Sequence, residues 1–492
     1  MKVVIGYPPL DSPKGAPLLS QNRQFQWFHS PTYIYPVVPA TAATMLKRAG
    51  YQVVWLDGIA EGWTFKQWQT RLEKEKPDLL MMETKTPVVK KHWRIIKQLK
   101  IRNLKLKIIL VGDHITALPK ESMENSKVDF LLTGGDYDFL LLNLVNHLEK
   151  GERLESGIWY REKGKIKNTG KFQLNHDLDK LPPIDRELTR WRLYAYKNGN
   201  YKYLPGTYIM AGRDCWWRKN GGCKFCSWTT LYPSWRVRSV ENVLNEIGGL
   251  IEKYHIKEIM DDTGTFPVGE WLRQFCLGMI KRGYYKKINF DCNMRFGVLT
   301  KKDYSLMARA GFRFLLFGLE SANQKTLDRL NKGIKVKEIE KELEAISKAN
   351  RETSGHLEPH VTCMVGYPWE TKEEAEETIA LTKSFFKKGL IDSLQATVVI
   401  PYPGTRLFSE AEKNDWLKTK NWDDYDMSRP VMKTPMEDKE VMSLARSIYT
   451  SSLTPQFVWK KLTSIKNADD LRFLLRAGKK FLGHLLDFSR KR

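Results

Sequence analysis

Three of the six cysteines lie close together in the sequence, at Cys215, Cys223 and Cys226. Their C-x7-C-x2-C spacing puts three thiols on one loop, and thiolates are the ligands that zinc and iron–sulfur clusters take from proteins. A structural zinc takes four protein ligands, whereas a [4Fe–4S] cluster held by three cysteines keeps one iron open for a small molecule. No fourth His or Cys is close in sequence, so a cluster is favoured and a zinc site completed by a remote ligand is the alternative.

Charged residues end several strand-like segments in the second half of the chain. Asp261 and Asp262 follow "IKEIM", Arg295 follows "INFDCNM", and Glu320 ends "FRFLLFGLE". Strands of a β/α barrel end at one common face, which is where such folds carry their sites. We therefore expect these side chains to lie near the cysteines. The alternative role for each of them is an ion pair at that face.

The elements that position these residues alternate between strands and helices. Over residues 1–150, apolar segments such as "KVVIGY", "PDLLMM" and "LKIILV" alternate with amphipathic ones such as "TFKQWQTRLEKEK". This alternation predicts a doubly wound parallel sheet whose ligands lie at the carboxyl ends of the strands. The GxGxxG fingerprint is absent from the first strand–helix turn, which argues against a dinucleotide.

The rest of the chain divides into three further regions. Residues 151–200 are typical of a connector, with a β-hairpin in "GIWYREKGKIKNTG" and an extended proline segment in "LDKLPPIDREL". Residues 201–420 resume the strand–helix alternation and predict a full or partial β/α barrel, with the cysteine loop after its first strand. Residues 421–492 are predicted to be helical and basic.

The cysteine loop and the later strand ends resemble the radical S-adenosylmethionine (SAM) superfamily. An aromatic residue precedes the last cysteine, and "MDDTGTF", "NMRFG", "FGLES", "GYPWET" and "PYPGT" follow in order. The superfamily's usual spacing is C-x3-C-x2-C, and this chain departs from it with seven residues between the first two cysteines. The resemblance implies a [4Fe–4S] cluster on the three cysteines with SAM at its open iron. The residues that it marks as candidates for holding SAM are Phe225, Asp262, Arg295 and Glu320.

The first 150 residues resemble the cobalamin-binding domain of the cobalamin-dependent branch of that superfamily. "VGDHITALP" is similar to that branch's GGxHxTxxP loop, and "ETKTP" to its Ser/Thr-x-Thr-Pro loop. The DxHxxG motif that supplies a histidine to cobalt is missing, because "LDGIAEGW" contains no histidine. Any cobalamin is therefore expected without a histidine ligand from that motif. The contact residues that the resemblance implies are Thr84, Thr86, Gly112, His114 and Gly134.

The fold class implied is α/β, with a Rossmann-like cobalamin-binding domain, a radical SAM partial (β/α)6 barrel and a helical C-terminal region. The connector and the tail are similar to a subgroup with the anaerobic magnesium-protoporphyrin cyclase and hopanoid-pathway enzymes. This implies a methyltransferase that acts on an unactivated carbon through a 5′-deoxyadenosyl radical. The alternatives are a cyclase or oxidase that uses the same cofactors without methyl transfer and, of another class, a basic zinc-binding nucleic-acid module, although we find no RRM or KH signature.

Composition bounds the setting and the partners. Six cysteines in 492 residues do not make a disulfide framework, so a reducing, cytoplasmic setting is expected. No apolar segment is long enough to cross a membrane, and no signal peptide is expected. The net charge of +24 favours anionic partners in general. The expected partners are a small-molecule or lipid substrate and an external electron donor of flavodoxin or ferredoxin type, without nucleic acid.

The last region has a sequence typical of a basic amphipathic helix. Leucines and a phenylalanine recur at helical spacing, at Leu471, Leu474, Leu475, Phe481, Leu482 and Leu485. The positive charges of this region include Arg472, Arg476, Lys479, Lys480, Arg490, Lys491 and Arg492. Such a helix can lie in a membrane interface, so peripheral contact with the inner face of the membrane is expected. The alternative is a helix whose leucines pack on the barrel.

Overall fold

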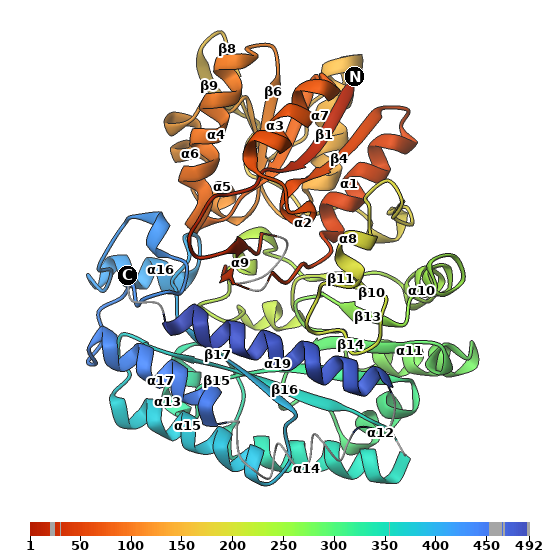
Figure 1. Ribbon diagram of the computed structural model, residues 1–492, viewed down its shortest axis with the longest axis vertical. Helices are drawn as coiled ribbons and strands as arrows, with labels where there is room; N and C mark the ends of the chain where they lie inside the picture. Colours follow the sequence, from red (N-terminus) through yellow and green to blue (C-terminus); the bar gives the residue numbers. More distant parts are fainter. Residues whose placement is uncertain (20–24, 30, 354, 452–464, 466–467, 490–492) are drawn as a thin grey trace.

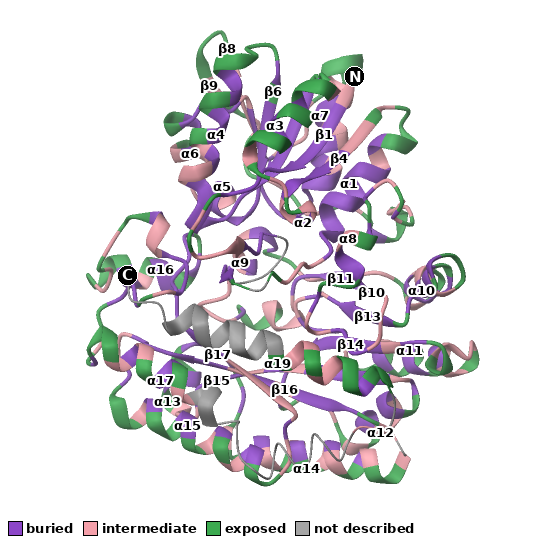
Figure 2. Ribbon diagram, viewed as in Figure 1, coloured by how far each residue is buried: buried purple, intermediate pink, exposed green. Residues whose placement is uncertain are grey.

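The computed structural model describes residues 1–492 except 20–24, 30, 354, 452–464, 466–467 and 490–492, and for 448–451 and 479–489 it describes the backbone only. Two α/β units lie one above the other in Figure 1, the first in red to orange and the second in green to cyan. Figure 2 shows that the central strands of both sheets are buried, while the outer faces of the surrounding helices are exposed.

The first unit is a seven-stranded sheet, of which five strands are parallel. Its central strands are apolar and buried on both faces, as in other parallel sheets covered by helices. The strands in sheet order are β4 (Gln52–Asp57), β1 (Lys2–Tyr7), β5 (Leu79–Glu83), β6 (Lys107–Val111), β7 (Phe130–Leu132), β8 (Ile158–Glu162) and β9 (Lys165–Asn168). The helices are α1 (Val37–Arg48), α2 (Gly58–Glu61), α3 (Phe65–Glu75), α4 (Val89–Arg102), α5 (Asp113–Ala117), α6 (Pro119–Asn125) and α7 (Tyr137–Lys150).

The order of the parallel strands identifies where a ligand of this unit would lie. Taken in chain order, the five parallel strands are arranged 2-1-3-4-5, so the chain changes direction across the sheet between β1 and β5. Ligands of open α/β sheets bind outside the carboxyl ends of the strands at such a switch point. The predicted hairpin is confirmed as β8 and β9, and it extends this sheet beyond residue 150 to Asn168.

The second unit is a six-stranded, all-parallel sheet, as expected for a partial (β/α)6 barrel. Its edge strands are β10 and β17, which are not paired with each other in the described part of the chain. The strands are β10 (Gly206–Ile209), β13 (Glu258–Asp261), β14 (Asn289–Met294), β15 (Phe312–Glu320), β16 (Glu358–Val365) and β17 (Ser393–Val398). The helices are α10 (Val240–Tyr254), α11 (Glu270–Lys281), α12 (Lys301–Arg309), α13 (Gln324–Arg329), α14 (Val336–Thr353), α15 (Lys372–Lys387) and α16 (Arg406–Lys413).

Side-chain caps set the start of the barrel helices. The hydroxyl of Ser239 accepts a hydrogen bond from the Asn242 N–H at the start of α10. Thr300 and Thr371 begin α12 and α15 with reciprocal capping boxes, which satisfy backbone N–H groups that a helix leaves unpaired. These caps define where each loop above the sheet ends and its helix begins.

The described part of the C-terminal region contains helices α17 (Asp438–Ser451) and α19 (Ala468–Ser489). Helix α17 packs on the edge strand β17, and the first turns of α19 lie beside the segment before the other edge strand. Leu471 and Leu475 are exposed on α19. The predicted apolar positions Phe481, Leu482 and Leu485 and the basic residues Lys479, Lys480, Arg490, Lys491 and Arg492 lie outside the described side chains. None of the helices in the described residues is both long and apolar enough to span a bilayer.

Candidate active site

The cysteine loop begins at the end of the first barrel strand and is closed at its base. Strands β11 (Gly212–Arg213) and β12 (Arg236–Val237) pair antiparallel on either side of the loop. Between them, residues Trp216–Asn220 form a short 3-10 turn, η3, and Trp228–Leu231 form a one-turn helix, α9. The seven residues between the first two cysteines therefore fold into a defined turn, which the spacing alone did not reveal.

Neighbouring loops hold this turn in place. Arg218 makes two hydrogen bonds, of 2.5 and 2.8 Å, to the buried carboxylate of Asp214. The side-chain amide of Asn331 donates to the carbonyls of Asn220 and Gly222, both at 2.8 Å. In return, the Trp217 indole N–H donates to the Asn331 carbonyl at 2.7 Å. The loop is therefore anchored on both sides of η3.

The three thiols are partly exposed, and polar groups approach two of them. The sulfur of Cys215 lies 2.9 Å from the hydroxyl of Thr265, and the guanidinium of Arg295 lies 3.8 Å from the sulfur of Cys223. Burial raises the pKa of the Cys215 thiol, and the Thr265 contact partly offsets this rise. In the described residues, no three His, Cys, Asp or Glu side chains are grouped closely enough to hold a single metal ion. The donor set fits a cluster, in which each cysteine binds a different iron.

The loop after β13 lies directly against the cysteine loop. A Cβ on Gly264 would stand 2.7 Å from the Asp214 carbonyl carbon and 3.0 Å from the Cys215 nitrogen, so only glycine fits this approach. Asp261 is fully buried and accepts hydrogen bonds from the N–H groups of Ala211 (2.6 Å) and Thr263 (3.0 Å). Burial raises the pKa of Asp261 to about 6.

The two adjacent carboxylates after β13 therefore face different surroundings. Asp261 ties the strand end to the cysteine loop, whereas the predicted residue Asp262 is partly exposed and its N–H donates to the Ile209 carbonyl at 2.9 Å. Successive side chains of a strand point to opposite faces, so one of the two had to point away from the other. Sequence analysis chose Asp262 and did not identify the structural role of Asp261.

Arg295 is buried beside the cysteine loop, and one nitrogen of its guanidinium makes no hydrogen bond in the described residues. Its guanidinium lies over the Trp217 ring, 4.2 Å from the ring centroid, and is 5.7 Å from that of Trp216. Its Nη2 atom is buried and has no hydrogen-bond partner in the described residues. Buried polar groups almost always have a partner, so an orphaned guanidinium N–H beside Cys223 suits a bound anionic group.

Glu320 is held at the end of β15 by a residue that sequence analysis missed. Its carboxylate pairs with the Lys332 ammonium at 2.8 Å, and both side chains are buried. The backbone of Glu320 has φ +68°, a left-handed conformation that few side chains adopt. The ammonium also lies 5.8 Å from the Phe225 ring centroid, so the predicted residues Phe225 and Glu320 are joined through Lys332.

The turn after β16 adds two further polar atoms without partners. The Glu370 carboxylate accepts the Gly366 N–H at 2.8 Å through one oxygen, while its other oxygen and the Tyr367 hydroxyl are buried without a hydrogen bond in the described residues. Burial raises the pKa of Glu370 to about 7. The "GYPWET" segment was the only signal in the sequence for these two residues.

In the first unit, the predicted contact residues bond to other residues of the same unit. The Thr84 hydroxyl lies 2.8 Å from His92, and the Thr86 hydroxyl lies 3.2 Å from His114. Gly112 has φ +125°, and a Cβ there would stand 2.2 Å from the Thr84 carbonyl oxygen. The glycine therefore lets the loops after β5 and β6 approach closely.

His114 is enclosed by its own unit and the second one. It is fully buried, its Nε2 lies 3.3 Å from the Glu121 carboxylate, and its ring packs between Trp93 and Trp422. The Trp422 indole donates to Glu121 at 2.8 Å. The Nδ1 atom of His114 thus bonds to a hydroxyl of its own unit, while its Nε2 atom faces Glu121 without a hydrogen bond in the described residues.

The carboxyl-terminal edge of the first sheet contacts the cysteine loop. A Cβ on Gly135 would stand 1.8 Å from the Tyr232 ring, and the Gly135 N–H donates to the Leu231 carbonyl at 2.9 Å. Its neighbour Gly134, with φ +83°, is packed against Phe172. The end of β7 therefore lies directly on the segment that follows the last cysteine.

A buried ion-pair network, which we call the interface network, strengthens this contact. It consists of Arg213 and Arg236 from the cysteine loop, Asp136 and Asp138 from the start of α7, and His176 from the connector. Arg213 donates to Asp136 at 2.7 Å and to Asp138 at 3.0 Å, and Arg236 donates to Asp136 at 2.7 Å. Burial of Asp136 is outweighed by Arg213 and its other partners, which hold the pKa of that carboxyl well below its usual range.

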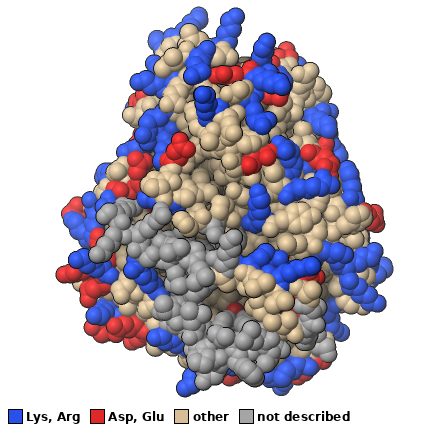
Figure 3. Space-filling model, in the orientation of Figure 1, with Lys and Arg blue, Asp and Glu red and all other residues tan. Residues whose placement is uncertain are grey.

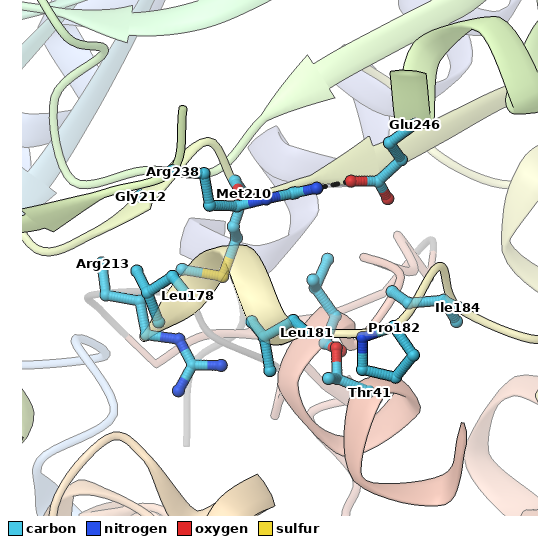
Figure 4. A pocket seen from close by; sticks show the side chains of 11 residues that line it. Thr41, Leu178, Leu181, Pro182, Ile184, Met210, Gly212, Arg213, Arg238 and Glu246 are labelled. Atoms are coloured by element: carbon cyan, nitrogen blue, oxygen red, sulfur yellow. Dashed lines mark hydrogen bonds and ion pairs between the residues drawn. The ribbon is translucent and has the colours of Figure 1, made fainter. Parts of the chain in front are cut away.

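A separate small pocket lies where α1, the connector and the first barrel strand meet (Figure 4). Thr41, Leu181 and Pro182 line one side, and Met210 lines another. Its rim carries the ion pair between Arg238 and Glu246, 2.6 Å apart. None of the predicted site residues lines this pocket, so we assign it to packing of the connector against the barrel.

Comparison with known proteins places the second unit in a family. Residues 212–382 match the model of the Radical SAM superfamily. The chain is 29% identical over 422 residues to an uncharacterized methyltransferase of Pyrococcus horikoshii, which covers 85% of this chain and 87% of that protein. It is 23% identical over 448 residues to the anaerobic magnesium-protoporphyrin IX monomethyl ester cyclase of Rubrivivax gelatinosus, covering 87% and 76% of the two chains.

The fold of the whole chain also has a counterpart among solved structures. The radical SAM methyltransferase TsrM from Kitasatospora setae, solved with cobalamin and a [4Fe–4S] cluster, matches with a TM-score of 0.66 at 12% identity over 99% of each chain. At this identity the likeness shows a shared fold. The resemblance drawn from the sequence motifs is confirmed at the level of the superfamily and of the two-unit architecture.

Proposed function

We propose that this chain, whose residues 212–382 form a radical SAM domain, is a cobalamin-dependent methyltransferase that acts on an unactivated carbon. One observation carries the proposal: the carboxyl-terminal edge of the first sheet rests on the cysteine loop through Gly135 and Arg213. A reaction that needs a radical source and a methyl carrier requires their two sites to face each other. The names of the Pyrococcus relative and of TsrM support methyl transfer.

The residues present fit the two cofactors in the following way. When bound, the cluster and cobalamin would supply one-electron cleavage of SAM and a transferable methyl group. Cys215, Cys223 and Cys226 would hold the cluster, and the spare N–H of Arg295 and the carboxylate of Glu320 are available to orient SAM. Lys332 fixes Glu320, and the Trp217 ring covers one face of the Arg295 guanidinium.

Cobalamin would lie outside the carboxyl ends of β1, β5 and β6, on the loops that contain Thr84, Thr86, Gly112, His114 and Gly134. We propose that cobalamin binds without a histidine ligand from the loop after β4, where the DxHxxG motif is missing, and that His114 shapes its own loop. His114 already contacts Thr86 and Glu121 and is packed between two indole rings. The second candidate function, cyclisation or oxidation with the same cofactors, is favoured only by similarity to the Rubrivivax cyclase.

We further propose a lipid-like or other apolar substrate and contact of α19 with an anionic membrane surface. The exposed leucines Leu471 and Leu475 lie one turn apart, and Arg472 between them is exposed as well. Basic residues near an anionic surface contribute about 1 kcal/mol each. Full-length protein should pellet with vesicles that contain anionic lipid at low salt, whereas the L471S/L475S variant should stay in the supernatant. Equal pelleting of both proteins would exclude this role for α19.

The central test is anaerobic reconstitution with iron, sulfide, SAM and methylcobalamin. The protein should bind about four irons per chain and one corrin, and the C215A/C223A/C226A variant should lose the iron and keep the corrin. Mass spectrometry of apolar extracts incubated with the protein should show a gain of one CH₂ per methylation. Loss of hydrogens without a mass gain would favour cyclisation or oxidation, and stoichiometric zinc without iron would exclude the radical SAM mechanism.

A further inference from the structure

The extension of the cysteine loop leaves one part of it at the surface. The seven residues between Cys215 and Cys223 form η3, and Lys219, Asn220 and Gly221 at its tip are exposed. We call residues 219–221 the loop tip. The later half of the cysteine loop is covered instead, because Trp228, Leu231 and Tyr232 are buried. The loop tip is therefore the side on which solvent, or a partner, approaches the cysteines.

The loop tip is close to the predicted cluster and is rigidly held. Lys219 is four residues from Cys215 and four from Cys223, so its Cα lies at most about 15 Å from either cysteine Cα. Asn331 holds the carbonyls on both sides of Gly221, and Arg406 donates to the Gly221 carbonyl at 2.8 Å. A partner that docks on this turn needs no rearrangement of the loop to come close to the cluster.

The charged residues in the sequence around the loop tip are all basic. Residues 215–240 contain no Asp or Glu, and their charged residues are Arg218, Lys219, Lys224, Arg236 and Arg238. Some of these charges are already neutralised, since Arg218 pairs with the buried Asp214 and Lys224 pairs with Glu410 at 2.5 Å. Within the described residues, neither Lys219 nor Arg406 has a carboxylate partner, and both side chains are exposed.

Positive charge alone would not mark a site on this protein. Lys and Arg are spread over much of the face seen in Figure 3, as the net charge of +24 requires. The loop tip differs in that Lys219, together with the neighbouring Arg406, is a cation without a carboxylate partner in the described residues and lies close to the predicted redox centre. The Lys219 ammonium also lies 5.4 Å from the Trp235 ring centroid, which restricts it to the surface of the loop.

We propose that the loop tip, together with Arg406, is the docking surface for an acidic one-electron donor protein of the flavodoxin or ferredoxin class. The inference rests on the proposed function, because it requires a cluster at the three cysteines. One electron leaves the reduced donor, which is oxidised by one electron, and the cluster is reduced by one. No bond forms or breaks at the docking surface. Complementary charge would bring the donor to the turn nearest the cluster and set its association rate.

The test compares two sources of electrons on the reconstituted full-length protein. Cluster reduction is followed by stopped-flow absorbance with reduced flavodoxin and, separately, with dithionite, which needs no docking. Lys219→Glu should slow reduction by flavodoxin about 3- to 10-fold at about 20 mM salt and leave reduction by dithionite unchanged. The difference in rate between the wild-type protein and Lys219→Glu should shrink at about 300 mM salt. Lys219→Arg should be reduced by flavodoxin at the wild-type rate. The matched control is Lys97→Glu, an exposed lysine on α4 that has the same charge change.

Each outcome decides between the alternatives. Equal slowing by Lys97→Glu would mean that the general field of the protein attracts the donor, and no slowing by Lys219→Glu would also overturn the docking surface. Slowing with both reductants would mean that the substitution disturbs the cysteine loop. This result would also overturn the proposed docking surface. Release of 5′-deoxyadenosine with dithionite is measured in parallel. Failure of the wild-type protein in that assay would reject the proposed function, while the cluster-reduction rates still report on docking.

Discussion

Each end of the barrel buries one arginine, and the two arginines differ in the partners that their guanidinium groups have. At the amino-terminal end, Arg313 on β15 donates to Glu358 at 2.6 Å, to Glu258 at 2.8 Å and to Asp291 at 3.0 Å. At the carboxyl-terminal end, Arg295 is almost as deeply buried, yet it has no carboxylate partner in the described residues, its Nη2 atom makes no hydrogen bond there, and its Nη1 atom lies near the sulfur of Cys223.

This difference separates stability from binding. A buried cation surrounded by carboxylates holds several strands together, whereas a buried cation that has no carboxylate partner in the described residues retains capacity for an anionic ligand. The carboxyl-terminal face of β/α barrels is the face that carries sites. The comparison therefore predicts that substitutions at Arg313 act on folding and that substitutions at Arg295 act on the reaction.

The largest effect is expected from Arg313→Met. The substitution leaves Glu258, Asp291 and Glu358 together in the barrel without their cation, and breaking a buried ion pair from one side costs about 3–5 kcal/mol. Urea unfolding monitored by circular dichroism should show this loss. Arg282→Met, which removes the surface pair with Glu241, is the control and should change the unfolding free energy by less than about 1 kcal/mol. Equal effects of the two substitutions would contradict the comparison.

The interface network tests whether pairing or position decides the role, because each of its cations has a carboxylate partner although the network lies near the cysteines. Burial alone would lower the pKa of His176. Its hydrogen bonds with Asp136 and Glu155 outweigh burial and raise this pKa from 6.5 to about 9. The contribution of protonated His176 to the free energy of unfolding is therefore fully present below about pH 6.5 and is lost as the pH rises through 9. The unfolding free energy should therefore fall by up to about 3 kcal/mol across this window.

His176→Gln should flatten this part of the stability profile and leave the profile below pH 6 unchanged in shape. The measurement is urea unfolding at a series of pH values from 6 to 9.5. A wild-type protein whose stability does not decline in this window would show that the network contributes little to holding the units together.

A smaller effect, on the reaction alone, is expected from Arg295→Lys. Lysine keeps the positive charge but lacks the planar guanidinium group, so it should lose one hydrogen bond to bound SAM. The loss of this bond costs about 1.5–3 kcal/mol, which corresponds to a decrease in the rate of SAM cleavage of about 10- to 150-fold. Release of 5′-deoxyadenosine measures it, with iron content as the control for an intact cluster. A loss of iron equal to that of the cysteine variants would show that Arg295 acts on the cluster loop instead.

The smallest effect is expected where α19 meets the amino-terminal end of the barrel. Asp470 lies 2.9 Å from the Lys202 ammonium, which has a second carboxylate, Glu358, at 3.5 Å. Because that partner remains, Asp470→Asn should lower the unfolding free energy by only about 1 kcal/mol. Limited proteolysis should show earlier cleavage near the start of α19. A loss as large as that of Arg313→Met would mean that α19 is part of the barrel's charge network.

Much of the fold was predictable because both sheets are built from local patterns. Apolar segments such as Leu79–Glu83 and Lys107–Val111 read as buried strands, and capped amphipathic segments such as Val240–Tyr254 read as helices. The cysteine cluster is also local, since its three thiols lie within one loop.

What could not be predicted depends on pairs that are distant in sequence. Nothing in the sequence links Arg213 to Asp138, 75 residues away, or identifies Lys332 as the partner of Glu320. The choice between Asp261 and Asp262 depends on which face of the strand each side chain takes, and a register of one residue reverses it. The contacts of the Thr84 and Thr86 hydroxyls with His92 and His114 also join separate segments of the chain, so the sequence pattern did not reveal them.

The contact of Gly135 with Tyr232 also bears on how the protein is assembled in the cell. Domains generally fold as units during synthesis, the amino-terminal one first, so the surface at the end of β7 is complete before the cysteine loop leaves the ribosome. Closure of the loop on that surface buries Arg213 and Tyr232 and leaves the three thiols only partly accessible. Iron and sulfide therefore reach the cysteines most easily while the two units are still apart, which makes the order of cluster loading and closure a step in biogenesis.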